Sequence, residues 1–229
     1  MPSIKNIIPG IIALFLSYAA QAQSLKAVQQ IEGIPPKVAY RAIAHDGSGN
    51  LYVATSVDVF MIPTNNNRAQ PMSVGDQIMD VDWSPDYGLI LLSKDGSIRF
   101  TATGKVLTVD AGTGATCMDV TKTMIWVGTN NGVSTVSIPQ EKVVKQYTTA
   151  DGILASNEIT FIHTDPSGIR WIGSRAGVVR IDGKKWKLYE KEQASTGLTP
   201  TSEGAWMAAD SNMWLVDAYN RWYPIDAWR

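Results

Sequence analysis

A phrase of the sequence is repeated several times, and an internal repeat limits the possible folds more strongly than any single residue does. The segment Asp165–Ile181 aligns with Asp46–Ile62 without a gap, and Thr123–Val136 is a third copy. The aromatic or aliphatic anchor of the phrase recurs at intervals of 36 to 45 residues, at Tyr52, Ile90, Trp126, Trp171 and Trp214. Five units of about 40 residues therefore account for the chain beyond its first residues.

Each unit consists of short β-like segments separated by turn residues. In the fourth unit these segments are Ile159–Thr164, Ile169–Gly173, Val178–Ile181 and Trp186–Tyr189. Strands of this length between Gly, Asn and Asp turns are typical of antiparallel β structure. Four strands in a repeat of about 40 residues are typical of one blade of a propeller. The sequence therefore predicts an all-β fold, a five-bladed β-propeller with four antiparallel strands per blade.

The residue type at the start of each third strand supports this alignment. Asp, Gly and Asn tolerate positive φ better than other residues, and a tight hairpin needs that geometry where its second strand begins. We therefore expect a tight turn at each such position. The positions are Asp58, Gly96, Gly132, Gly177 and Asn220.

The two ends of the chain predict how the ring closes. The fifth unit has Arg221–Ile225 as its third strand and only Asp226–Arg229 after it, whereas Leu25–Ile31 is a spare strand before the first unit. We expect Leu25–Ile31 to complete the last blade as its fourth strand. This arrangement would close the ring, remove the open sheet edges that promote aggregation, and make the gene product complete.

The first residues have the features of a secretory signal. Lys5 precedes the apolar run Ile7–Ala20, and Ala20-Gln21-Ala22 fits the small-x-small rule for cleavage. We expect removal of residues 1–22, which leaves residues 23–229 as a single propeller domain in the periplasm or outside the cell. An uncleaved anchor or a buried helix is the alternative, although the run is short for a transmembrane helix.

Composition narrows the classes of function. The formal net charge of −1 argues against a nucleic-acid partner, which would require a basic surface. The single Cys117 cannot form an internal disulfide, so we expect it to be buried in a monomer that is stabilised by packing. His45 and His163 lack the nearby ligands of a recognisable metal site, and phosphate-loop, G-x-S-x-G and H-E-x-x-H motifs are missing. No cofactor is therefore predicted.

The phrase Asp151–Ile159, followed by Asp165-x-x-Gly168-x-x-Trp171-Ile-Gly-Ser174-x-x-Gly177, resembles the two-component regulator propeller repeat. That family's pattern runs D-G-L-x-S-N, a short strand, D-x-x-G and L-W-I-G-T-x-x-G-L. The fourth unit matches almost throughout. The third keeps Trp126–Thr129 and Gly132, the first keeps Asp46–Gly49, and the second and fifth are degenerate.

The resemblance implies a propeller fold without a family catalytic motif. Such repeats commonly form the periplasmic sensor region of hybrid histidine kinases, where the ring accepts a ligand often related to polysaccharide, and they also occur in free-standing secreted proteins. This chain has no kinase part and fewer units than the seven blades usual in those sensors, so a kinase function is not implied.

The recurrent positions are predicted to be structural. Trp126, Trp171 and Trp214 recur at one strand position, which favours packing between blades over a platform for sugars. Gly128 and Gly173 are expected where neighbouring sheets approach too closely for a side chain. Ligand contacts are therefore sought where the copies of the repeat differ.

One face of a propeller carries the turns between second and third strands and the loops between fourth and first strands. The amides, cations and aromatic ring expected there suit sugar or peptide contacts, and the long loop Glu190–Glu203 would lie on the same face. The leading hypothesis is a non-catalytic secreted or periplasmic recognition module for a glycan, a peptide or an envelope protein. Its predicted ligand-binding residues are Lys94, Asn130, Asn131, Asn157, Arg175 and Tyr219.

A catalytic alternative depends on Asp80 and Asp119. Both occur as Met-Asp-Val in a first strand, the strand that lines the central channel of a propeller. A glycosidase needs two carboxylates at a defined separation, calcium binds oxygen ligands of this kind, and hydration of a polar channel wall requires neither. Because Asp46–Thr55 also resembles repeats of lactonase-like propellers, the alternative is a hydrolase or lyase acting on a saccharide or lactone, with Asp80 and Asp119 as its acids.

Overall fold

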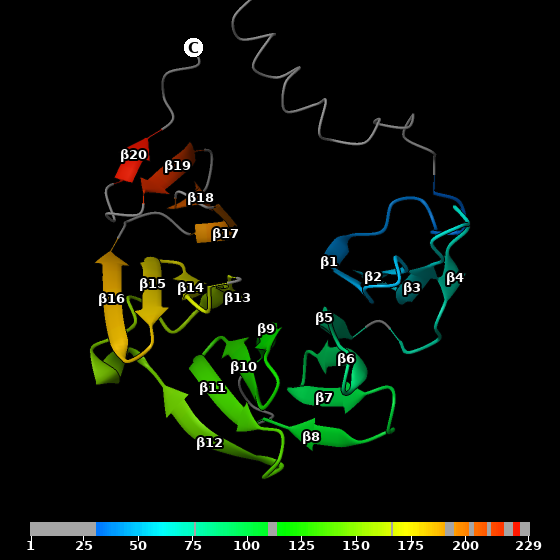
Figure 1. The fold of residues 1–229 in the computed structure, drawn as a ribbon, viewed down its shortest axis with the longest axis horizontal. Helices are drawn as coiled ribbons and strands as arrows, with labels where there is room; N and C mark the ends of the chain where they lie inside the picture. The colour runs from blue at the N-terminus through cyan, green and yellow to red at the C-terminus, as the bar shows by residue number, and fades with distance from the viewer. Residues whose placement is uncertain are drawn as a thin grey trace, which may run out of the picture. The chain divides into compact units, whose positions relative to one another are not determined.

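A computed structural model of the protein describes residues 31–75, 77–109, 114–165, 167–190, 195–201, 204–209, 212–217 and 222–224. The chain divides into two compact units, residues 1–32 and residues 33–229. The second unit contains five antiparallel sheets of four strands each, in which the strands follow one another in chain order (Figure 1). The predicted all-β class and the four-stranded antiparallel units are therefore confirmed.

The first sheet contains β1 (Tyr40–His45), β2 (Leu51–Thr55), β3 (Val59–Ile62) and β4 (Gln70–Pro71), and the second contains β5 (Ile78–Ser84), β6 (Gly88–Ser93), β7 (Ser97–Phe100) and β8 (Val106–Thr108). The third contains β9 (Ala115–Val120), β10 (Met124–Thr129), β11 (Gly132–Ser137) and β12 (Lys142–Tyr147). The 3-10 helix η2 (Thr149–Asp151) precedes the fourth sheet, β13 (Ile159–Thr164), β14 (Arg170–Ser174), β15 (Gly177–Asp182) and β16 (Lys185–Glu190). The fifth contains β17 (Ser195–Thr201), β18 (Gly204–Ala209), β19 (Asn212–Asp217) and β20 (Trp222–Pro224).

Consecutive sheets pack face to face, and the first strands β1, β5, β9, β13 and β17 contact one another in this order. The strand β6 shows why its sequence is a continuous apolar run. Leu89 and Leu91 pack toward the first sheet, while Ile90 and Leu92 pack toward the third. A strand that is buried on both faces cannot alternate apolar and polar residues. The core therefore lies between the sheets, as in a propeller.

A β-bulge recurs at the beginning of the first strand in every sheet. The register shifts between Tyr40 and Ala42, between Ile78 and Asp80, and at the corresponding places in the other three sheets. Bulges of this kind are inherited features of a fold. The geometry of the repeat is therefore kept even in the second and fifth units, where its sequence is degenerate.

The prediction for the third strands is confirmed at three glycines. Gly96, Gly132 and Gly177 have φ of 85°, 101° and 148°, in the region that favours glycine. A tight turn is also present at Asp58, closed by a hydrogen bond of 2.9 Å from the Thr55 N–H to the Asp58 carbonyl, but the expected positive φ is wrong there, because Asp58 is not among the described residues with positive φ. Its carboxylate instead accepts the backbone N–H groups of Val59, Ser73 and Val74, and so anchors the segment that leads into β5.

The predicted strands of the fifth unit are wrong. Ser195–Thr201, expected in a loop, is the first strand, and Trp222–Pro224 is the fourth. Trp206 lies opposite Thr199 as Trp171 lies opposite His163, so Trp206 and not Trp214 holds the second-strand position. Both tryptophans lie in β-like segments, and the sequence pattern alone did not distinguish them. Asn220 lies outside the described residues, and Asn212 starts the third strand.

Two predictions concern the N-terminal part of the chain. The signal peptide of residues 1–22 and residues 25–30 of the expected closing strand lie outside the described residues. Because the last sheet has a fourth strand of its own, the strand count does not require Leu25–Ile31 to supply it. Among the described residues, no helix has the length and apolar character needed to cross a membrane.

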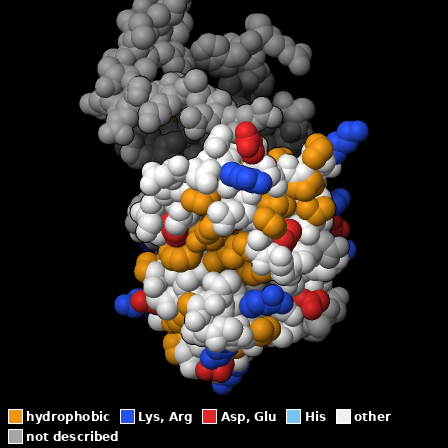
Figure 2. All heavy atoms as spheres, turned by 90° about the vertical axis from the view of Figure 1, so that its right-hand side faces the viewer, with side chains coloured by type: hydrophobic (Ala, Val, Ile, Leu, Met, Phe, Trp, Pro, Cys, Tyr) orange, Lys and Arg blue, Asp and Glu red, His pale blue; other side chains and the backbone are white. Residues whose placement is uncertain are grey.

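The outer edge of the first sheet is short. β4 has two residues, and its Pro71 suits an edge strand because an edge does not need the missing N–H for pairing. Figure 2 shows this side of the molecule, where apolar side chains gather between charged side chains of both signs. Basic and acidic groups are therefore interspersed on this face, in keeping with the small net charge of the chain.

Candidate functional site

Aspartates of the first strands join neighbouring sheets. The Asp80 and Asp82 carboxylates of β5 accept the backbone N–H groups of Met118 and Val120 in β9, at 2.7 and 3.1 Å. Asp119 accepts the N–H of Thr164 in β13 at 2.9 Å. An edge amide of a first strand has no partner within its own sheet, and a buried N–H needs one. These carboxylates therefore serve as hydrogen-bond acceptors at the junctions between sheets.

The second oxygen of each predicted catalytic carboxylate also has a partner. Oδ1 of Asp80 accepts the N–H of Val81 at 2.8 Å. Oδ2 of Asp119 accepts the Thr164 hydroxyl at 2.6 Å and the Nε–H of Arg170 at 3.2 Å, and only 11% and 13% of the Asp119 and Arg170 side chains are exposed. These hydrogen bonds therefore explain the presence of both carboxylates, Asp80 and Asp119, without a bound substrate.

The pKa of Asp80 is raised to about 7, chiefly by burial. The hydrogen bonds from Met118 and Val81 lower this pKa, whereas the nearby charges of Asp82 and Asp119 raise it. Burial also raises the pKa of Asp82. Perturbed carboxyl groups are common in active sites but also occur in structural networks. Here the perturbation follows from the use of buried carboxylates as junction acceptors.

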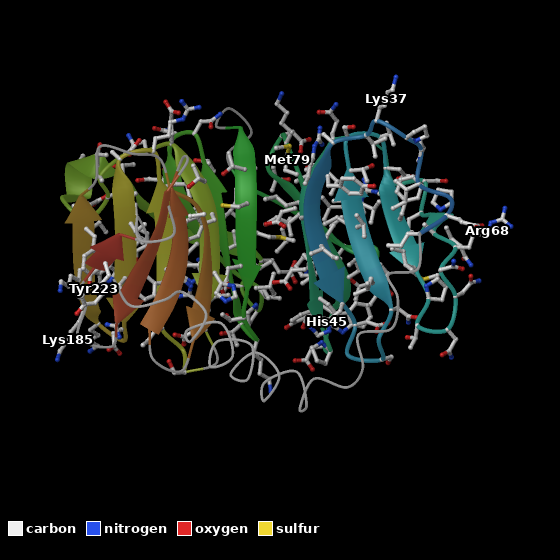
Figure 3. All side chains as sticks on the ribbon, turned by 90° about the horizontal axis from the view of Figure 1, so that it is seen from above. Lys37, His45, Arg68, Met79, Lys185 and Tyr223 are labelled. Carbon is white, nitrogen blue, oxygen red and sulfur yellow. The ribbon has the colours of Figure 1, made fainter. Side chains whose placement is uncertain are left out.

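The turns that carry the predicted ligand-binding residues lie at one end of the sheets, which we call the loop end. Each turn is hydrogen-bonded to the segment that precedes the first strand of its own sheet. The bonds run from Lys94 N–H to the Gln77 carbonyl at 2.8 Å, from Asn130 N–H to Gly114 at 3.1 Å and from Arg175 N–H to Glu158 at 3.2 Å. In Figure 3 the loop end is the upper one, where Met79 and Lys37 lie, whereas His45 lies at the lower end.

Further backbone bonds at the loop end link neighbouring sheets. The carbonyl of Lys94 accepts the N–H of Ala115 at 3.1 Å, and that of Asn157 accepts the N–H of Gly132 at 2.8 Å. Five of the six predicted residues therefore share this end of the molecule, and Tyr219 lies outside the described residues. The frame that presents the turns is fixed by backbone hydrogen bonds.

The five residues differ in how available they are to a ligand. Lys94, Asn130 and Asn131 are exposed. Asn157 is half-buried, and its Oδ1 accepts the N–H of Thr149 at 2.8 Å. Arg175 is 70% exposed and pairs with Glu158 at 2.6 Å. The side chains best placed for ligand contact are therefore Lys94, Asn130 and Asn131.

A cavity of about 200 Å³ lies beside the Lys94 turn. The carboxylate of Asp95 and the guanidinium of Arg99 both line this cavity. A hydrogen bond from the Ser97 N–H lowers the pKa of Asp95. Sequence reasoning missed Arg99 because it occupies an ordinary outward position of a short strand. The lining residues are Val74, Gly75, Gln77, Ile78, Ser93, Asp95 and Arg99.

The expected packing role is confirmed for Trp126. The guanidinium of Arg170, from the next sheet, lies 4.2 Å from the centre of its ring. A Cβ on Gly128 would lie 2.6 Å from the side chain of Ile159 in the next sheet, as predicted. A Cβ on Gly173 would instead clash with Phe161, which lies on the adjacent strand of the same sheet. The close approach at Gly173 is therefore within a sheet and not between sheets.

Comparison with known proteins gives no relative by sequence. No family model matches the chain, and no curated protein matches it. Solved structures do match. The extracellular domain of a protein described as a hybrid two-component system from B. thetaiotaomicron has a TM-score of 0.71 and 12% identity over 85% of this chain, which covers 28% of that domain.

Two further structures share the fold. Streptogramin B lyase has a TM-score of 0.69 and 13% identity, with 86% of this chain and 72% of the lyase covered. A chain of a nidogen–laminin complex has a TM-score of 0.63 and 10% identity, with 83% and 80% covered. At such identities the likeness concerns the fold alone. The protein therefore has a propeller-like all-β fold of the kind found in extracellular domains of two-component systems, and it spans less than a third of the first of these domains.

Proposed function

We propose that this protein is a non-catalytic recognition module of the periplasm or the cell exterior, which binds a glycan, a peptide or an envelope protein at its loop end. The observation that carries the proposal is the arrangement of Lys94, Asn130 and Asn131. Three exposed polar side chains stand on turns whose backbones are tied to neighbouring segments. A rigid frame with adaptable polar groups is a common basis for recognition.

Other observations support the same proposal. One structural neighbour is the extracellular domain of a protein described as a hybrid two-component system, and another is a chain of a nidogen–laminin complex. The proposal includes cleavage after Ala22, so that residues 23–229 act as one monomeric domain. Fold likeness does not identify the ligand, because one fold can host many functions.

We also propose that the five sheets form a closed five-bladed ring. Ile43 of β1 is 65% exposed, whereas Val81, Met118 and Ile162, at the same position of the next three first strands, are 4%, 5% and 7% exposed. Tyr40 shows the same contrast with Ile78. Packing of the last sheet against this face of β1 would bury both side chains.

The alternative function is a hydrolase or lyase of saccharides or lactones. The pKa of Asp80 near neutrality and the fold shared with a lyase favour it. However, each oxygen of the Asp80 and Asp119 carboxylates already accepts a hydrogen bond within the protein. A recognition function requires no change in these bonds, so we prefer it.

The test is binding of the purified protein to glycan and peptide arrays, followed by titration of the strongest ligand. The combined variant Lys94→Ala, Asn130→Ala, Asn131→Ala should weaken binding at least about tenfold, the equivalent of about 1.4 kcal/mol. The control Lys122→Ala alters an exposed turn between β9 and β10 and should leave affinity unchanged. Turnover of a saccharide or lactone that is lost in Asp119→Asn, without simple binding, would instead establish the enzyme.

A further inference from the structure

Aromatic rings and cations form a column between the third and fourth sheets. Arg170 lies over the ring of Trp126, and Trp126 stacks on Tyr147 with centroids 5.7 Å apart and an interplanar angle of 6°. The amine of Lys145 lies 4.4 Å from the centroid of Tyr147. Trp186, from β16, lies 4.8 Å from Tyr147. The column thus connects the Asp119–Arg170 pair of β9 and β14 with the outer strands β12 and β16.

A groove of about 340 Å³ opens beside the outer end of this column. That volume lies in the range of small-molecule sites, which is roughly 300–1,000 Å³. Trp186, Tyr147 and Ile153 are half-buried against the core and present apolar surface. The groove is lined by Lys145, Tyr147, Asp151, Ile153, Lys184 and Trp186.

The surroundings of the groove are basic. Lys145 and Lys184 line it, and the same outer strands and their turn carry further exposed lysines. Two acidic side chains next to these strands in the sequence are paired with other cations, Glu141 before β12 with Lys105 and Asp182 at the end of β15 with Arg180. This local excess of positive charge contrasts with the net charge of −1 for the chain. The further lysines are Lys142, Lys185 and Lys187, of which Lys185 is labelled in Figure 3.

Asp151 narrows the chemistry of an anionic ligand. Its Oδ2 accepts the N–H of Thr148 at 2.7 Å, and its other oxygen can accept a hydrogen bond from a ligand. A carboxylate inside the groove repels the closely spaced phosphates of a nucleic acid but suits a hydroxyl donor. The ligand that fits combines one carboxylate, several hydroxyl groups and an apolar face.

We propose that this groove binds an acidic saccharide, such as one hexuronate unit of an acidic polysaccharide. The ring of Trp186 packs against the apolar face of the sugar, Lys145 and Lys184 pair with its carboxylate, and Asp151 accepts a hydroxyl hydrogen. The groove contains none of the residues predicted to bind a ligand at the loop end, and its argument does not depend on the function proposed for that end.

The test uses tetragalacturonate as the probe. Its binding is measured by titration calorimetry and by tryptophan fluorescence, at low ionic strength, where charge pairs are least screened. We expect saturable binding that is at least tenfold weaker for the neutral methyl ester of the same oligomer. Lys184→Glu should weaken binding about tenfold, because it replaces an attraction with a repulsion. Trp186→Phe should keep the fold and retain most of the affinity, since it preserves an aromatic surface.

The matched control is Lys122→Glu, which changes the net charge equally but lies in the exposed turn between β9 and β10, and it should change affinity less than about twofold. Two results overturn the proposal: absence of saturable binding of tetragalacturonate, or equal weakening by Lys122→Glu and Lys184→Glu. Equal affinity for a thymidine oligonucleotide of matched charge also overturns it, because it identifies a non-specific anion surface. Failure here leaves the array test of the loop-end variant unaffected.

Discussion

At the scale of single residues, the buried carboxylates show how a polar group can be structural. Asp80, Asp82 and Asp119 accept amides from the next sheet, which removes unpaired N–H groups from the junctions. The ionised form of Asp80 is disfavoured by burial, so the pKa of its carboxyl rises to about 7. The same group therefore links the stability of the protein to pH.

The first prediction concerns Asp80→Asn. Between about pH 4 and pH 7 the native protein holds a proton on Asp80 that the unfolded chain releases, so the contribution of this group to stability falls as pH rises. Asparagine keeps one oxygen acceptor, for the N–H of Met118, loses the acceptor for the N–H of Val81, and cannot ionise. The wild type should therefore lose stability from pH 4 to pH 8 in a way that the variant does not. The free energy of unfolding of the variant should rise by about 2–4 kcal/mol relative to that of the wild type over this range, at about 1.4 kcal/mol per pKa unit.

Urea denaturation at both pH values measures this gain. The control Asp86→Asn lies in the exposed turn between β5 and β6 and should preserve the pH dependence of the wild type. A pH dependence of Asp80→Asn that matches the wild type would show that Asp80 does not supply it.

At the scale of elements, the sheets approach one another most closely where a glycine replaces a side chain. The second prediction is that Gly128→Ala destabilises the protein by about 1–3 kcal/mol, the usual cost of overpacking. The new Cβ would meet Sγ of Cys117 at 2.5 Å and the side chain of Ile159 at 2.6 Å. Thermal or urea denaturation measures the loss.

Cys117→Ala provides the matched second variant, because it removes the sulfur from this contact. The double variant should be more stable than the sum of the two single effects predicts. Additive losses would show that the sulfur is not the obstacle, and that the clash with Ile159 alone sets the cost.

The strands of the first four units follow from the sequence, because their turns carry glycine or aspartate at fixed places in the repeat. The fifth sheet does not follow, because Trp206 and Trp214 both fit a β-segment and hydrogen-bond pairing alone selects between them.

A further regularity appears only in the structure. In the fourth sheet His163 holds the position that Asp119 holds in the third, and in the fifth sheet Pro200 holds the position that Thr164 holds in the fourth. Proline has no N–H group, so the junction that lacks the carboxylate also lacks the donor.

The candidate sites differ in the same way. The loop end could be predicted because turns that share a register in the repeat lie at one end of the sheets. The groove could not, because Tyr147 and Trp186 come from different units and from unequal positions within them. Their contact depends on how two sheets pack, which the spacing of the repeat does not specify.

At the scale of the whole molecule, the third prediction tests closure of the ring. In a closed ring Ile43 is buried against the last sheet, and Ile43→Lys then places a charge in an apolar contact. The variant should lose at least about 2 kcal/mol of stability, as Val81→Lys should at the equivalent buried position. Chemical denaturation compares the two variants.

Val106→Lys is the control, because Val106 is 51% exposed on an outer strand, and it should change stability by less than about 0.5 kcal/mol. A similarly small effect of Ile43→Lys would show that the face of β1 remains open to solvent. The comparison therefore decides between a ring and an open series of sheets.

The carboxylate hydrogen bonds from the second sheet to the third, and from the third to the fourth, share one direction along the chain. Asp80 precedes its donor Met118, and Asp119 precedes its donor Thr164. Because a chain is made from its N-terminus, the second and third sheets leave the ribosome with these acceptors in place before the next sheet supplies the donors. Until then their inner edges carry carboxylates, and charge on an exposed edge discourages pairing with other chains. The groups that later join these sheets are therefore expected to protect their edges during synthesis.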